Sequence, residues 1–203
     1  MATEGERRGP GRPPASSRDA VEQVALALML RDGYDAVNVD AIAAAAGIGR
    51  TTFFRYFGSK PGVIWAPFDA TIDGLEAMID TAPSGGDPFE ILREAIVGST
   101  RTALYSSAVW LERFQLLDAY PSLRSEAYEH WERWKQVVAQ HVARAAATQS
   151  NEVVPMAVAG ACQGVFLAEL RDWNNRDEDR EDVLDRLDRD LLAVCSALRS
   201  LLP

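Results

Sequence analysis

Residues 39–60 read VDAIAAAAGIGRTTFFRYFGSK, and this stretch decides the fold. Asn38 stands directly before it and is a suitable side-chain cap for a short helix that buries Ile42 and Ala46. Gly47 then permits the positive φ angle that a tight turn requires. The pattern therefore predicts a short helix followed by an abrupt change of direction.

A second short helix is predicted over about residues 49–57. Phe53 and Phe57 lie four residues apart on one helical face, so we expect both to pack in a small core. Arg50 and Arg55 point away from that face. Two short helices joined by a glycine-containing turn, the second of them polar, are typical of the helix-turn-helix motif that binds DNA.

Helical periodicity continues on both sides of this stretch. Ser16 or Ser17 can cap an earlier helix, which Gly33 is placed to end. Later segments with 3.6-residue spacing predict helices at about 60–80, 88–105, 107–118, 122–148, 152–173 and 181–201. No alternating strand pattern occurs, so we predict an all-α protein.

The N-terminal and C-terminal parts of the chain differ in net charge. The 203 residues carry a formal net charge of −9, of which residues 1–60 contribute +1 and residues 61–203 contribute −10. A negative total can conceal a local cationic patch. We therefore predict a flexible basic arm at 1–15, a three-helix DNA-binding domain at 16–60, and a helical ligand-binding and dimerisation domain at 61–203.

The stretch resembles the DNA-binding block of the TetR family of transcriptional repressors, in which apolar, glycine, aromatic and lysine positions recur with this spacing. Three positions depart from the family pattern: Asn38 replaces a capping Thr, Gly49 replaces a capping Ser, and Phe54 stands where Tyr is common. The first departure keeps a cap, the second weakens one, and the third removes a hydroxyl that could reach a phosphate. The resemblance implies a DNA-binding repressor.

Base or near-base contacts are expected from Arg50, Thr51 and Arg55 on the second short helix. A helix that enters the major groove meets base edges with its N-terminal side chains, while other contacts fix its register on the phosphates. Asn38, which caps the preceding helix, completes this part of the predicted interface.

The phosphate contacts follow from the family resemblance. It implies that Thr52, Tyr56 and Lys60 hold phosphates and that Phe54 packs on the sugar–phosphate edge. The N-terminal run Gly9–Pro14 is similar to arms that place an arginine in the minor groove, and Arg12 is the residue that would do so. A flexible terminus without DNA contact is the alternative for this arm.

A further resemblance begins after Lys60. The residues Val63-Ile64-Trp65 and Phe68-Asp69 resemble the corresponding run in the mycofactocin-system regulators of the family. This resemblance implies control of a redox-peptide gene cluster, with long-chain acyl-CoA as the effector class. Four arginines are available to hold the CoA phosphates at a pocket mouth: Arg93, Arg101, Arg113 and Arg133.

Aromatic side chains concentrate in residues 61–203, which contain all five Trp. An aromatic-rich helical domain can enclose an apolar pocket, although the same residues can equally form ordinary core. The predicted ligand-binding set is Trp65, Phe68, Phe89, Arg93, Arg101, Trp110, Phe114, Trp131 and Trp134.

The last two predicted helices carry patterns typical of packing surfaces. The first has small residues on one stripe, which permit close backbone approach, and the second has apolar residues at three- and four-residue steps. The predicted dimerisation set is Ala157, Gly160, Ala161, Gly164, Leu187, Leu191, Val194 and Leu198. The resemblance implies a four-helix interface between two copies, with packing inside one chain as the alternative. A dimer would place two recognition helices on the half-sites of a near-palindromic operator.

No residue pattern typical of catalysis or metal binding stands out. His130 beside Glu126 and Glu129 is expected on a solvated helix face, the alternative being a metal site or general base. Cys162 lies in an apolar helical pattern, where cysteine behaves as a small hydrophobe, and neither Cys162 nor Cys195 has metal-ligand spacing. We therefore expect no enzymatic activity and no cofactor.

The N-terminal residues lack the apolar core of a secretory signal, and no uninterrupted apolar run approaches the roughly 18 to 20 residues of a membrane span. We therefore expect a cytoplasmic protein without a membrane segment. The sequence predicts a dimeric, ligand-responsive repressor. The alternative is a helical small-molecule carrier or adaptor that does not bind DNA.

Overall fold

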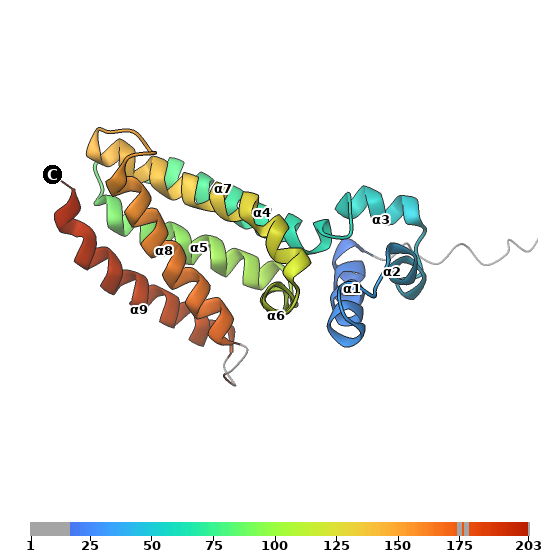
Figure 1. Cartoon of the computed structure of the whole chain (residues 1–203). Helices are drawn as coiled ribbons and strands as arrows, with labels where there is room; N and C mark the ends of the chain where they lie inside the picture. The colour runs from blue at the N-terminus through green and yellow to red at the C-terminus, as the bar shows by residue number, and fades with distance from the viewer. Residues whose placement is uncertain (1–16, 174–175, 177–178, 203) are drawn as a thin grey trace, which may run out of the picture.

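The computed structural model describes residues 17–173, 176 and 179–202, and the regular structure in these residues is entirely helical (Figure 1). The prediction of an all-α fold is confirmed. The predicted basic arm, with Arg12, lies outside the described residues.

Three helices form a small head: α1 (Arg18–Asp32), α2 (Val39–Ala45) and α3 (Arg50–Phe57) (Figure 1). Ser17 caps α1 by accepting a hydrogen bond from the Ala20 N–H, and Asn38 caps α2 by accepting one from the Ala41 N–H. These caps satisfy amide groups that the first helical turn leaves without partners. Each helix therefore begins where the sequence predicted.

The turn between α2 and α3 depends on Gly47, whose φ angle is 67°. Side chains with a Cβ atom rarely adopt this left-handed conformation, whereas glycine does so without strain. The Ile48 N–H donates to the Ala43 carbonyl, which reverses the chain within a few residues. Gly49 begins α3 without a side-chain cap, as expected from the sequence.

Six described helices form the body, an elongated bundle to one side of the head (Figure 1). They are α4 (Gly62–Asp80), α5 (Pro88–Ser106), α6 (Glu112–Ala119), α7 (Pro121–Ala146), α8 (Val153–Asp172) and α9 (Arg180–Leu198), followed by a 3₁₀ turn at Arg199–Leu201. The helix predicted from residue 107 begins later, because Ser107–Leu111 form a turn.

Three pairs of described side chains lie where the head meets the body. The Tyr34 and Tyr120 ring centroids lie 6.1 Å apart, and the Ser122 hydroxyl lies 2.9 Å from an Asp35 carboxylate oxygen. The third pair, Glu22 on α1 and Arg113 on α6, is buried. These three pairs are called the head–body junction below.

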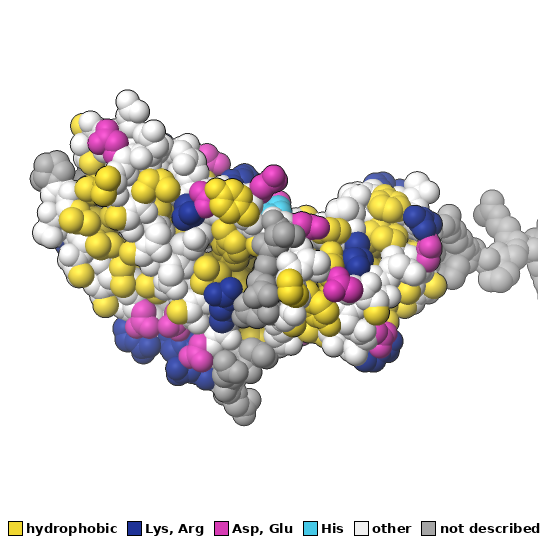
Figure 2. Space-filling model, in the orientation of Figure 1, with side chains coloured by type: hydrophobic (Ala, Val, Ile, Leu, Met, Phe, Trp, Pro, Cys, Tyr) yellow, Lys and Arg dark blue, Asp and Glu magenta, His cyan; other side chains and the backbone are white. Residues whose placement is uncertain are grey.

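One described helix, α8, is long and apolar enough to cross a membrane by length and composition, and 33% of its most apolar window is buried inside the structure. A helix of this composition is also found where its exposed apolar surface packs against another protein chain. Apolar side chains spread over the surface that α8 and α9 form (Figure 2).

Candidate functional site

The outer face of α3 carries four of the predicted DNA-contacting side chains. Arg50, Thr51, Phe54 and Arg55 are all exposed, whereas Phe53 is completely buried. The Phe53 and Phe57 ring centroids lie 5.2 Å apart and hold this helix on the core of the head. Because the aromatic face is buried, the hydrogen-bonding groups of Arg50, Thr51 and Arg55 face the solvent.

The two arginines on this face differ in their partners. The Arg50 guanidinium lies 2.7 Å from both carboxylate oxygens of Asp40, and both side chains are more than half exposed. Among the described residues Arg55 has no ion pair, although its guanidinium lies 5.2 Å from the Tyr56 ring centroid. Because an exposed ion pair is worth about 0–1 kcal/mol, Asp40 restrains Arg50 only weakly.

Lys60 is placed differently from its predicted role as a phosphate contact. Its ammonium group donates hydrogen bonds to the carbonyl oxygens of Tyr34 and Val37, at 2.9 and 3.0 Å, and lies 4.0 Å from the Tyr34 ring centroid. Burial lowers the pKa of Lys60. Lys60 therefore joins the end of the head to the α1–α2 connection, and its charge faces the protein itself.

The remaining phosphate candidates lie at the inner edge of the same surface. Thr52 and Tyr56 are half-buried on α3, and Phe54 is 40% exposed beside them. The exposed Arg18, which the sequence analysis did not select, donates a hydrogen bond to the Tyr56 carbonyl and lies over the Phe57 ring. A basic residue at the first position of a helix does not by itself indicate a DNA contact, so the sequence did not identify Arg18.

The Glu22–Arg113 ion pair is the most buried charged contact described in the head–body junction, with side chains 5% and 2% exposed. Burial lowers the pKa of Arg113, and the nearby Arg18 acts in the same direction. The Ser107 hydroxyl lies 3.5 Å from the same Glu22 carboxylate. Glu22 is buried on α1 beside Val21. A carboxylate among the apolar residues of a buried helix face needs a partner, so this position could have indicated a buried ion pair from the sequence.

The predicted ligand-binding aromatics form core instead of lining one pocket. Phe68 and Trp131 pack at 4.4 Å between ring centroids, and Trp134 packs on Phe166 at 5.3 Å. The prediction of one site is corrected for seven members, which are held in the core or in ion pairs and do not line the cavities beside Trp65 and Trp110: Phe68, Phe89, Arg93, Arg101, Phe114, Trp131 and Trp134. Helical spacing identifies an inward face but not what lies opposite it.

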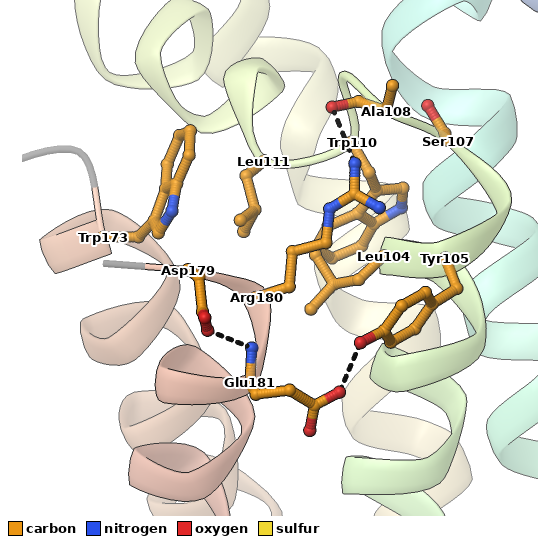
Figure 3. Close-up of a pocket in the computed structure, with 10 residues that line it drawn as sticks. All are labelled: Leu104, Tyr105, Ser107, Ala108, Trp110, Leu111, Trp173, Asp179, Arg180 and Glu181. Atoms are coloured by element: carbon orange, nitrogen blue, oxygen red, sulfur yellow. Dashed lines mark hydrogen bonds between the residues drawn. The ribbon is translucent and has the colours of Figure 1, made fainter. Parts of the chain in front are cut away.

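Two other members of the set line separate cavities. Trp65 lies against His130, with rings stacked at 4.4 Å, beside a hollow near the start of α4. Trp110 lines a cavity of about 440 Å³ between the end of α5, the turn before α6, the end of α8 and the start of α9 (Figure 3). His130 is half-buried and lies 2.7 Å from Asp69, so its predicted solvated position is corrected.

The cavity beside Trp110 contains residues that the sequence analysis did not select. Leu104, Leu111 and Trp173 supply apolar walls, while Arg180 and Glu181 supply charges (Figure 3). Trp173 lies at the end of one predicted helix, and Arg180 lies just before the start of the next predicted helix. The fold brings both residues to one cavity, and helical periodicity contains no information on such a neighbourhood.

The predicted dimerisation residues differ in their burial. Ala157, Gly160 and Gly164 are exposed on α8, whereas Leu187 and Leu191 on α9 are completely buried inside the single chain. The prediction that these two leucines contact a partner is corrected, because their side chains already pack in the chain's own core. Ala161, Val194 and Leu198 are half-buried.

The described part of the chain contains no group of three or more His, Cys, Asp or Glu side chains that could hold a metal ion. Cys162 and Cys195 are both buried and are not joined by a disulfide.

Two family models match the chain. The first, described as bacterial regulatory proteins of the tetR family, matches residues 23–64, and the second, described as the MftR C-terminal domain, matches residues 86–199. The chain belongs to the TetR family of transcriptional regulators. The first match covers the α1–α3 head, and the second extends from the start of α5 to the end of α9.

A relative from Mycobacterium tuberculosis is named as a mycofactocin biosynthesis transcriptional regulator, MftR. It is 29% identical over 163 residues, which cover 80% of this chain and 82% of the relative. The resemblance to mycofactocin-system regulators is thereby confirmed as a similarity of sequence.

Solved structures show the same fold at low identity. The fatty acid degradation regulator FadR from Bacillus halodurans has a TM-score of 0.67 and 18% identity, covering 94% of this chain and 99% of that one. FadR from Thermus thermophilus, a transcriptional repressor in complex with lauroyl-CoA, has a TM-score of 0.56 and 19% identity, covering 88% and 93%.

Proposed function

We propose that this protein is a ligand-responsive transcriptional repressor that binds a near-palindromic operator as a homodimer. The observation that carries the proposal is the outer face of α3, where Arg50, Thr51 and Arg55 are exposed on a helix fixed by buried Phe53. Such donors suit base edges in the major groove, where arginine reads guanine with two hydrogen bonds.

The side chains around this face have distinct roles in the proposal. Arg55 contacts bases directly, and Arg50 does so after its exposed pair with Asp40 opens. Thr52 and Tyr56 hold phosphates, Phe54 packs against the backbone edge, and Asn38 positions the start of α2. Lys60 is a positioning residue that fixes the α1–α2 connection.

The exposed small-residue stripe of α8 supports the homodimer. Ala157, Gly160 and Gly164 leave a surface that a second α8 could approach closely, and the exposed Leu192 and Ala193 of α9 extend it with apolar area. Burial of this face against a second copy also accounts for an apolar helix that the single chain covers only partly. A twofold dimer would present two α3 helices to two half-sites.

An apolar effector is proposed to release the operator, and long-chain acyl-CoA is the specific class to test. The structural neighbour that binds lauroyl-CoA and the similarity to MftR support this choice. The junction pair Glu22–Arg113 would transmit effector binding, because it joins α6 of the body to α1 of the head. An effector acts only through its different affinities for the DNA-binding and released states.

A gel mobility-shift experiment tests the proposal with DNA upstream of the protein's own gene and genomic fragments selected by the protein. Wild type should form a complex, Arg55→Ala should need a higher protein concentration to form it, and the control Arg144→Ala on the body should bind as wild type does. Palmitoyl-CoA should release the wild-type complex. If no fragment binds either protein, the function is the alternative one, a cytoplasmic carrier or adaptor without DNA binding.

The proposal further places the protein in the cytoplasm, without a membrane segment, cofactor or catalytic activity. Its relatives are named as transcriptional regulators, which supports this assignment.

A further inference from the structure

The cavity between the end of α5, the turn before α6, the end of α8 and the start of α9 has an apolar interior and a charged rim. Leu104, Trp110, Leu111 and Trp173 line its walls, and Arg180 lies across it (Figure 3). Its volume of about 440 Å³ is within the range of small-molecule sites. Shape and composition therefore permit a small apolar ligand.

Two donor groups in this lining lack a full set of acceptors. Trp110 is 1% exposed, and its indole N–H has no hydrogen-bond partner among the described residues. A buried donor without an acceptor costs about 1–3 kcal/mol, and unexplained cases point to a missing partner. The Arg180 guanidinium, which carries five N–H donors, makes one hydrogen bond of 3.4 Å to the Ala108 carbonyl and no ion pair with a described residue.

The acceptor groups of the rim are already engaged. Glu181 accepts from the Tyr105 hydroxyl and pairs with Arg101 at 2.7 Å, and these contacts lower the pKa of its carboxyl. Asp179 accepts from the N–H groups of Glu181 and Asp182 as the cap of α9. Trp110 and Arg180 thus supply donors that the described lining leaves without a full set of acceptors, while the rim also carries two carboxylates.

We propose that this cavity binds an apolar monocarboxylate. The carboxylate accepts from Arg180 and from the Trp110 indole N–H, and the apolar part lies against Leu104, Leu111 and Trp173. A single carboxylate satisfies both donors, whereas a polyanionic ligand would place further negative charge beside Asp179 and Glu181. The site is distinct in chemistry from one that holds the phosphates of acyl-CoA.

Ligand binding in this cavity would affect the head through a few neighbouring residues. Ser107 lines the cavity, and its hydroxyl lies 3.5 Å from Glu22 of the head–body junction. Arg113, the partner of Glu22, lies two residues after Leu111 of the cavity wall. This regulatory consequence rests on the proposed function, whereas ligand binding itself does not.

Isothermal titration calorimetry of the full chain with octanoate, in the absence of DNA, tests the site. Octan-1-ol is the matched neutral ligand. Arg180→Gln should weaken octanoate binding roughly ten- to hundredfold and leave octan-1-ol binding unchanged, as expected for a charge-assisted hydrogen bond. Trp110→Phe, which keeps a ring, should weaken octanoate binding roughly three- to tenfold.

Two further variants control for indirect effects. Ala108→Trp places a large side chain on an exposed residue of the lining and should abolish binding. Arg189→Gln, on the exposed face of α9, should bind octanoate as wild type does. The proposal is overturned if Arg180→Gln binds octanoate as tightly as wild type, if Ala108→Trp leaves binding intact, or if octanoyl-CoA competes at lower concentrations than octanoate.

The same proteins then separate this site from the proposed function. Octanoate binding that follows the predicted variant pattern supports the site even where no DNA fragment is bound. Release of the operator by palmitoyl-CoA without octanoate binding removes the cavity proposal and leaves the repressor intact.

Discussion

Arginine serves opposite purposes on α3 and in the head–body junction. Arg55 is exposed and has no ion pair with a described residue, whereas Arg113 is 2% exposed and pairs with Glu22. An exposed guanidinium keeps its donors for a partner outside the protein, while a buried one must be compensated within it. The difference separates a recognition surface from a structural connection, and variants of each should fail in different assays.

The largest effect is expected at the junction. Arg113→Ala should lower the free energy of unfolding by about 3–5 kcal/mol, because it leaves the Glu22 carboxylate buried without its partner. Chemical denaturation measures the change. The double variant Glu22→Met with Arg113→Met should lose less stability than Arg113→Ala, since neither charge then remains buried. An Arg113→Ala loss below about 1 kcal/mol would show that the pair is not buried in solution.

On α3, Arg55→Ala should weaken operator binding by about 1–3 kcal/mol and leave the free energy of unfolding within about 0.5 kcal/mol of wild type. Fluorescence anisotropy with labelled operator measures the first quantity and denaturation the second. Arg31→Ala, at the end of α1 and paired with Asp32, is the matched control and should change neither. Equal loss of affinity in both variants would contradict direct recognition by Arg55.

Lys60 tests whether one cationic residue stabilises the fold or contacts DNA. Lys60→Met should cost about 1–2 kcal/mol of stability, because the Tyr34 and Val37 carbonyls lose their donor. The salt dependence of operator binding should stay unchanged. If Lys60 were instead a phosphate contact, the slope of log affinity against log salt would fall by about 1.

The smallest effect is expected at Asp40. Asp40→Asn should increase operator affinity by less than about 1 kcal/mol, because it frees Arg50 from an exposed ion pair. Anisotropy at low salt measures the change, and Asp73→Asn on the body provides the control. Lower affinity in Asp40→Asn would show that the pair orients Arg50 for DNA.

The sequence predicted the elements whose signals are local. Ser17, Asn38 and Gly47 act at the ends of their own helices, so their caps and turn follow from side-chain type and position. The spacing of Phe53 and Phe57 likewise predicted which face of α3 is buried and which remains available.

Contacts between distant segments could not be predicted in this way. The repeat of Leu187 and Leu191 identifies an apolar face, but the same repeat suits a partner chain or the chain's own core. Lys60 reaches carbonyl groups more than twenty residues away, and Trp110 and Arg180 line the same cavity although they are far apart in the sequence. Only the folded arrangement specifies such neighbours.

The salt dependence of operator binding by wild type and Arg55→Ala tests the central claim most directly. For wild type, the logarithm of the association constant should fall linearly with the logarithm of salt concentration, with a slope of roughly −0.9 per phosphate contacted. Arg55→Ala should bind more weakly at every salt concentration. A flat response, with the two proteins indistinguishable, would show that α3 does not bind DNA.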